Sequence, residues 1–100
     1  MNTINIQAYA WISGSMGTTD HQNQTLSQPV RAGATIHDLF SELAQKYPDF
    51  KEKVFDPHSD KFSDQVMVIV NGRLIQYREF KTSVINDKDK IILSPVLVGG

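Results

Sequence analysis

The chain finishes in two glycines, Gly99 and Gly100, which follow an apolar run at residues 95–98. Glycine has no side chain to pack and loses much conformational entropy on ordering, so this pair adds nothing to a core. It is either a frayed end or a slim arm that carries its carboxylate into a narrow site. A terminal carboxyl has a pKa of about 3.3–3.7, so at neutral pH it is an anion and a poor electrophile. Chemistry at Gly100 would therefore require activation of this carboxylate first.

Side chains that could do chemistry elsewhere are sparse. Cysteine is absent, which excludes disulfides, thiolate metal sites and a cysteine nucleophile. His21, His37 and His58 are scattered and show no spacing of metal ligands. Asp87 and Asp89 flank a turn without the further ligands of a calcium loop. We therefore expect no metal site, no bound cofactor and no enzyme activity in this chain alone.

Composition bounds the class of protein. One hundred residues, 40% of them hydrophobic, suffice for a single small domain over residues 1–100. A formal net charge of −1 gives no general attraction to nucleic acid or to an anionic membrane. No apolar run approaches the roughly 18 residues of a membrane span, and the first residues lack a signal-peptide pattern. We expect a cytoplasmic protein that is monomeric when free.

The first third of the chain predicts an antiparallel hairpin with a long connection. Residues 3–11 alternate, with Ile4, Ile6 and Ala8 on one face, which is the pattern of a half-buried strand. Residues 13–17 are small and contain glycines, which predicts a loop. A weaker strand is predicted for residues 23–30.

A helix follows. Thr35 is a good N-cap, and Asp38 three residues later resembles a capping box. One apolar stripe runs over three turns, formed by Ile36, Leu39, Phe40, Leu43, Ala44 and Tyr47. Pro48 ends the helix. Residues 49–55 predict a short helical turn, and residues 56–60 a polar loop.

The remaining residues predict strands. Residues 66–70 form the strongest strand, and Asn71-Gly72 predicts a type I′ turn with positive φ at both positions. A short return strand at 73–77, a turn at 86–89 and a last strand from 91 complete the order. We predict an α+β fold, the β-grasp (ubiquitin-like) roll. A mixed sheet of four to five strands packs on one main helix, the last strand lies inside the sheet parallel to the first, and residues 96–100 leave as a free flexible tail.

Strand parity predicts an apolar surface on the sheet. If Ile91 and Leu93 point into the core, Ile92 points outward, and by the same rule Met67 and Ile69 face solvent. Such an apolar cluster would be a protein interface. Burial of the same residues by a loop at 56–65 is the alternative.

Three further residues are expected near this surface. The tail residues Leu97 and Val98 would lie beside it. Arg73 ends the predicted hairpin and could form an ion pair at the rim of the interface.

Several motifs resemble the sulfur-carrier proteins of the ThiS and MoaD group. They are residues 70–73, the turn at 87–89, the strand at 91–96 and the final Gly99-Gly100. Residues 43–51 are also similar to longer MoaD-like proteins and to small archaeal ubiquitin-like modifiers. The resemblance covers roughly residues 30–100. Lys88 departs from it, because family members often have glycine there, and residues 13–21 match no family motif.

The resemblance implies a mechanism. A partner enzyme of the E1-like (MoeB/ThiF) type uses ATP to adenylate Gly100, and a sulfur donor displaces AMP to leave a thiocarboxylate. The chain is then a carrier and a substrate, and ATP belongs to the partner. A MoaD-like carrier would bind the large subunit of molybdopterin synthase and supply sulfur to molybdopterin. Alternatives are a ThiS-type carrier for the thiazole of thiamin, a modifier joined through Gly100 to lysines, and an interaction module whose glycines are incidental.

Overall fold

The computed structural model describes residues 2–16 and 24–96, so the predicted tail residues from Leu97 to Gly100 lie outside it. In chain order its elements are β1 (Asn2–Ala8), α1 (Trp11–Gly14), β2 (Gln24–Val30), α2 (Ile36–Lys46), α3 (Pro48–Lys53), β3 (Phe55–Asp56), β4 (Lys61–Phe62), β5 (Val66–Val70), β6 (Arg73–Ile75), the 3-10 turn η1 (Tyr77–Glu79) and β7 (Lys90–Pro95).

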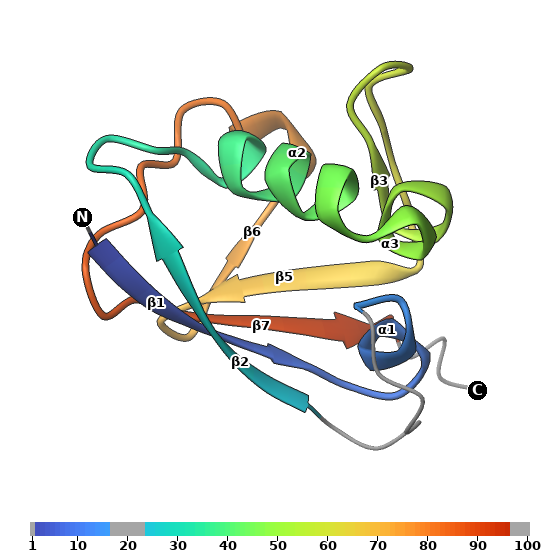
Figure 1. The fold of residues 1–100 in the computed structure, drawn as a ribbon, viewed down its shortest axis with the longest axis horizontal. Helices are drawn as coiled ribbons and strands as arrows, with labels where there is room; N and C mark the ends of the chain where they lie inside the picture. Colours follow the sequence, from blue (N-terminus) through green and yellow to red (C-terminus); the bar gives the residue numbers. More distant parts are fainter. Residues whose placement is uncertain (1, 17–23, 97–100) are drawn as a thin grey trace.

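Five strands form a mixed sheet in the order β2-β1-β7-β5-β6. β1 and β7 run parallel, and the other neighbours are antiparallel. α2 crosses one face of this sheet, as Figure 1 shows. The last strand therefore lies between β1 and β5, in the interior of the sheet. This arrangement confirms the predicted β-grasp fold and the parallel pairing of the first and last strands.

α2 begins and ends where the sequence predicts. The Thr35 Oγ1 accepts from the Asp38 N–H at 3.2 Å, and the Asp38 carboxylate accepts from the Thr35 N–H at 3.0 Å. This capping box lowers the pKa of Asp38, chiefly through the bond from the Thr35 main chain. Pro48 opens α3 directly after α2. No helix within the described ranges is long and apolar enough to cross a membrane.

The core lies between α2 and the inner face of the sheet. The alternation predicted for residues 3–11 is confirmed as far as Ala8, because Ile4, Ile6 and Ala8 are buried, but the strand ends there and Trp11 begins α1. Val66 and Val68 of β5 and both Ile91 and Leu93 of β7 are buried on the same face. They meet the apolar stripe of α2, which consists of Ile36, Leu39, Phe40, Leu43 and Ala44. The strand register assumed from the sequence is therefore correct.

The prediction of a loop from residue 13 is wrong for the part that the structure describes. Residues 11–14 form the helical turn α1, and Ile12 and Met16 are buried in the core. Serine hydroxyls satisfy main-chain carbonyls here, since Ser13 Oγ donates to Ala10 at 2.8 Å and Ser15 Oγ donates to Ile12 at 2.6 Å. Small polar residues thus occupy a buried turn because each hydroxyl has a partner in the same turn.

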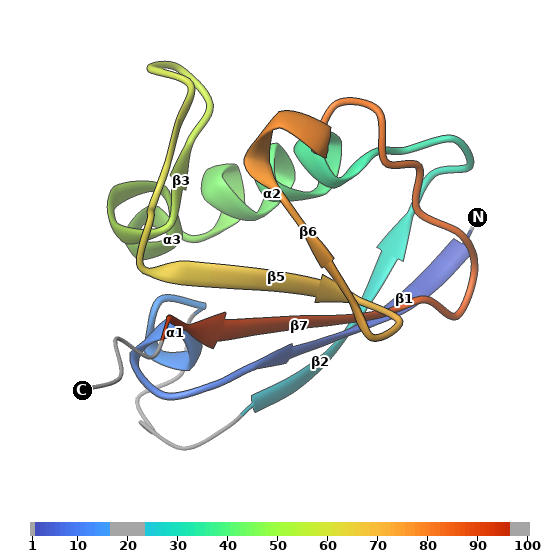
Figure 2. The same cartoon turned by 180° about the vertical axis from the view of Figure 1, so that it is seen from behind.

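The polar loop predicted at 56–60 is the tip of a small hairpin, β3–β4, which extends beyond α3 (Figure 2). Phe55 and Phe62 pair across it. Phe62 stacks on Tyr77 with ring centroids 5.8 Å apart and meets the edge of Phe80 at 4.9 Å. Phe40 of α2 lies 5.3 Å from Phe80. The hairpin is therefore held to the helix side of the molecule by aromatic contacts.

Tyr77 ties η1 to the tip of this hairpin. Its hydroxyl donates to the main-chain carbonyl of Asp60 at 2.7 Å and also contacts the Asp60 carboxylate. Burial, together with the hydrogen bond to Asp60, raises the pKa of Tyr77 to about 12. The fold thus favours the protonated phenol.

The raised pKa of Tyr77 predicts a loss of stability at high pH. An unfolded tyrosine titrates near pH 10, so the stabilisation is complete below about pH 10 and is lost as pH rises toward 12. In urea unfolding, the difference in free energy of unfolding between wild type and Tyr77→Phe should therefore shrink as pH rises from about 10 to 12. At neutral pH the variant should lose about 1 kcal/mol, the usual net value of one hydrogen bond. A difference independent of pH would contradict the assignment.

Two turns are joined at the end of the sheet opposite the base of the tail. Asn71 has φ 51° and Gly72 φ 85°, which confirms the predicted turn. Asn71 Nδ2 donates to Asp89 Oδ1 at 2.9 Å, and Asn71 Oδ1 accepts from the Lys90 N–H at 3.0 Å. The second turn is formed by residues 86–89. Its other acidic residue, Asp87, accepts a hydrogen bond from the Thr3 N–H at 2.8 Å. Both acidic residues of this turn therefore have structural partners.

Lys88 adopts φ 69° between these two acidic residues. A residue with a Cβ is destabilised in this left-handed conformation by roughly 1–2 kcal/mol, and glycine, which has no Cβ, is not. Because glycine loses more entropy on folding, Lys88→Gly should stabilise the protein by a net amount of about 0.5–1 kcal/mol. Chemical denaturation measures this directly. Lys88→Ala is the matched control and should not stabilise the fold, since alanine keeps the Cβ.

Candidate partner-binding face and the base of the tail

The outer face of the sheet carries an apolar row. Ile69 of β5 lies directly opposite Ile92 of β7, and Met67 lies opposite Ser94. Met67, Ile69 and Ile92 are each partly exposed, whereas their neighbours along both strands, Val68 and Leu93, are buried. The structure therefore brings together the three apolar residues that parity predicts for one outer surface.

Leu74 extends this row and was not predicted. It pairs with Ile69 across the β5–β6 hairpin and is 54% exposed. Because cross-strand pairs share a face, the partner of an outward Ile69 must also point outward. Pairing back from the Asn71-Gly72 turn could have identified it. We call Met67, Ile69, Leu74 and Ile92 the apolar sheet face.

The same face becomes polar on β1 and β2. Continuing across from Ile92, the register places Gln7 of β1 and then Thr25 of β2. Gln7 accepts a hydrogen bond from the Tyr9 hydroxyl at 3.0 Å. The outer surface is thus divided into an apolar half on β5, β6 and β7 and a polar half on β1 and β2. An apolar partner surface would match only the first half.

Arg73 does not share this face. It pairs with Val70, whose side chain packs against the core. Its guanidinium lies 3.5 Å from the Glu79 carboxylate, in an exposed ion pair. The structure therefore places Arg73 on the helix side of the sheet, in a contact within the chain.

Residues 56–65, the predicted alternative cover, lie elsewhere. Residues 56–62 belong to the β3–β4 hairpin, which packs through Phe62 against Phe40, Phe80 and Tyr77 on the helix side, and residues 63–65 lead from it into β5. Among the described residues, this loop leaves the apolar sheet face open.

The tail begins beside this face. β7 ends at Pro95, which pairs with Val66. One residue further, the Val96 N–H donates to the Gln65 carbonyl at 2.8 Å. The predicted functional residues Leu97, Val98, Gly99 and Gly100 follow and lie outside the described residues.

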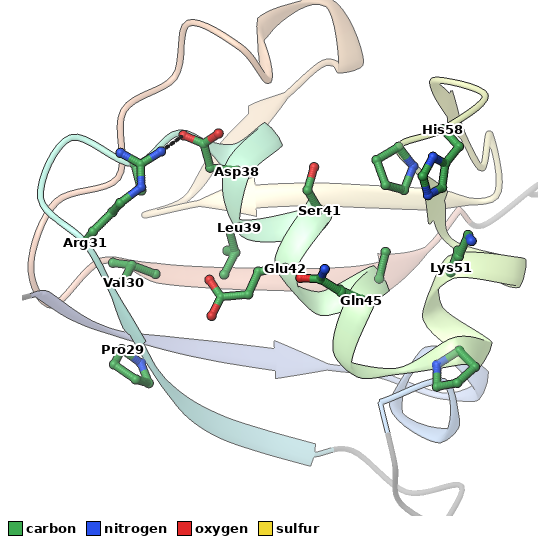
Figure 3. Close-up of a pocket in the computed structure, with 14 residues that line it drawn as sticks. Pro29, Val30, Arg31, Asp38, Leu39, Ser41, Glu42, Gln45, Lys51 and His58 are labelled. Carbon is green, nitrogen blue, oxygen red and sulfur yellow. Dashed lines mark hydrogen bonds and ion pairs between the residues drawn. The ribbon is translucent and has the colours of Figure 1, made fainter.

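A cavity lies on the other side of the molecule. It has a volume of about 910 Å³ and crosses the outer surface of α2, between the end of β2 and the β3–β4 hairpin (Figure 3). Arg31 and Asp38 form an ion pair at one end of it, with their side chains 3.1 Å apart, and Lys51 and His58 lie at the other. Within residues 2–16 and 24–96, no three His, Asp or Glu side chains gather in a way that could hold a metal ion.

These features define a ubiquitin-like β-grasp protein with an apolar sheet face at the base of its tail. Residues 17–100 match the model of the ThiS family. The chain therefore belongs to this family of small ubiquitin-like carrier proteins, which are not enzymes themselves. The family match also covers the C-terminal residues that the structure does not describe.

Solved structures agree on the fold. SAMP1 from Haloferax volcanii superposes with a TM-score of 0.73 at 19% identity, over 99% of this chain and 100% of that one. A candidate molybdopterin converting factor, subunit 1, from Pyrococcus furiosus superposes with a TM-score of 0.71 at 20% identity, over 97% of this chain and 100% of that one. The small archaeal modifier protein 1 of Methanosarcina acetivorans superposes with a TM-score of 0.66 at 24% identity, over 100% of this chain and 98% of that one. No curated protein matches the sequence.

Proposed function

We propose that this protein is a sulfur carrier whose Gly100 carboxylate is activated by an E1-like adenylating enzyme. The observation that carries the proposal is the position of the apolar sheet face beside the strand that leads to Gly99-Gly100. A partner that covers Met67, Ile69 and Ile92 would receive the tail at the same time. Activation and docking would then occur on one enzyme.

The chemistry proceeds in two steps that divide one difficult substitution. A carboxylate oxygen of Gly100 attacks the α-phosphorus of ATP, and pyrophosphate leaves. Hydrosulfide from a sulfur donor then attacks the acyl carbon, AMP leaves with the oxygen it gained, and the sulfur loses its proton. The product is a thiocarboxylate on Gly100. The adenylating enzyme binds the ATP, and this chain supplies only the acyl group and the docking surface.

For the acceptor of the sulfur, we propose molybdopterin, with the synthase large subunit as the second partner. Support comes from residues 43–51, which are similar to longer MoaD-like proteins, and from the likeness to the Pyrococcus furiosus structure. Delivery to the thiazole of thiamin is the alternative within the same family. Likeness to a protein named as an archaeal modifier favours a second function, an isopeptide bond from Gly100 to a lysine.

Intact mass spectrometry of the protein from its native cells tests these functions. Exchange of one oxygen for sulfur at Gly100 would support the carrier. Peptides from other proteins that bear a Gly-Gly branch on lysine would support the modifier. If incubation with ATP and the E1-like enzyme of the same organism produces no adenylate, both functions are refuted and the fold serves as an interaction module.

A further inference from the structure

The bond from the Val96 N–H to the Gln65 carbonyl is the last main-chain hydrogen bond described before the tail. It lies one residue beyond β7, which ends at Pro95. The bond keeps the β5–β7 register, in which Gln65 is the next residue opposite Val96, so Val96 is held by one last rung of this ladder, through a single carbonyl. The four residues from 97 to 100 follow this point.

A turn holds Gln65 in place. The Ser63 N–H donates to the Val54 carbonyl at 2.8 Å, and the Ser63 carbonyl accepts from the Val66 N–H at 3.4 Å. Ser63 Oγ accepts from the Gln65 N–H at 3.1 Å. The Gln65 main chain is thus fixed on both sides, and its carbonyl is presented to the end of β7.

This turn is joined to the rigid body of the protein. Phe62, directly before Ser63, contacts Phe80 and stacks on Tyr77. Val66, directly after Gln65, is buried at the start of β5. The anchor for Val96 is therefore supported by core contacts on the helix side as well as by the sheet.

We propose that the Gln65 carbonyl is a positioning group that sets where the tail enters the activating enzyme, an inference that rests on the proposed function. Four residues beyond Val96 reach at most about 14 Å. Release of Val96 would add one residue, roughly 3.5 Å, to the length of chain between the last anchored residue and the Gly100 carboxylate. The Gly100 carboxylate would then spend less time in line with the α-phosphorus of ATP, so the chemical step would slow.

Val96→Pro and Val96→Ala test this proposal as a matched pair. Both variants lose the isopropyl group, but only proline removes the N–H. In ATP–pyrophosphate exchange with the E1-like enzyme of the same organism, kcat for Val96→Pro should fall roughly three- to tenfold below that of Val96→Ala, as expected for one net hydrogen bond. KM should change by less than about twofold, because the apolar sheet face is intact in both.

Because proline also restricts the chain, Ser63 supplies a second test. Ser63→Ala removes the acceptor for the Gln65 N–H and should lower kcat in the same direction, whereas Ser63→Thr keeps a hydroxyl and should restore it. Amide exchange at Val96 in the free protein gives a readout without the enzyme. We expect this amide to be protected at least about tenfold relative to an unstructured peptide.

The outcomes separate the two proposals. An unprotected Val96 amide, or equal kcat for the two Val96 variants, would overturn the positioning role. Absence of exchange activity with wild type would refute the proposed function, and the amide measurement would still decide whether Gln65 anchors the tail.

Discussion

Replacement of Gly100 by valine should abolish activation of the protein and leave its fold unchanged. A β-branched side chain widens the arm and restricts its χ1 rotamers next to the reacting carboxylate. Displacement of a reacting group by about 1 Å can cost about a hundredfold in rate, and we expect at least this loss. The measurement is ATP–pyrophosphate exchange with the E1-like enzyme, followed by mass spectrometry for thiocarboxylate.

The controls for Gly100→Val separate chemistry from docking. The apolar sheet face lies on β5, β6 and β7, so the variant should bind the enzyme as wild type does. Its unfolding midpoint should also be unchanged. Gly100→Ala adds only a methyl group and should lose less activity than valine. Accumulation of thiocarboxylate on Gly100→Val would refute the assignment of chemistry to this residue.

Replacement of Ile69 by aspartate should weaken binding to the activating enzyme. Ile69 lies at the centre of the apolar sheet face, between Leu74 and Ile92. A carboxylate there would be buried without a partner in the complex. Central interface residues cost about 2–4 kcal/mol when disrupted, which corresponds to roughly a 30- to 1000-fold increase in Kd.

Thr25→Asp is the matched control for Ile69→Asp. It places the same charge on the same side of the sheet, but on the polar half, where Thr25 is exposed. We expect its Kd to stay within about threefold of wild type, as for a charge at the rim. Calorimetric titration measures Kd, and urea unfolding of the free variants checks their stability. Equal losses of affinity in both variants would exclude a localised interface.

Strand parity allowed three of the four residues of the apolar sheet face to be predicted from the sequence. Alternation in residues 66–70 and 91–93 has only one arrangement that buries Val68 and Leu93, so Met67, Ile69 and Ile92 had to face outward. The turn at Asn71-Gly72 was equally determined, because few residue pairs adopt positive φ twice. Leu74 was accessible by the same rule.

Other features depend on contacts that no local pattern records. α1 is four residues long, too short for a helical repeat, and its burial depends on where Ile12 and Met16 meet the core. β3 and β4 contribute two residues each, and Phe62 finds its partners in Tyr77 and Phe80, which are distant in sequence. The ion pair of Arg73 with Glu79 similarly forms only once η1 packs beside β6.

The central position of β7 has a mechanical consequence. β1 and β5 hold this strand from both sides, one parallel and one antiparallel. Traction applied to the chain beyond Val96 would pull β7 along its own axis, so the hydrogen bonds of both ladders would bear the load in shear at the same time. An edge strand such as β6 has one ladder and would peel away bond by bond. We expect the force needed to unfold this domain to be far greater when an unfolding enzyme pulls on the chain beyond β7 than when it pulls on β6.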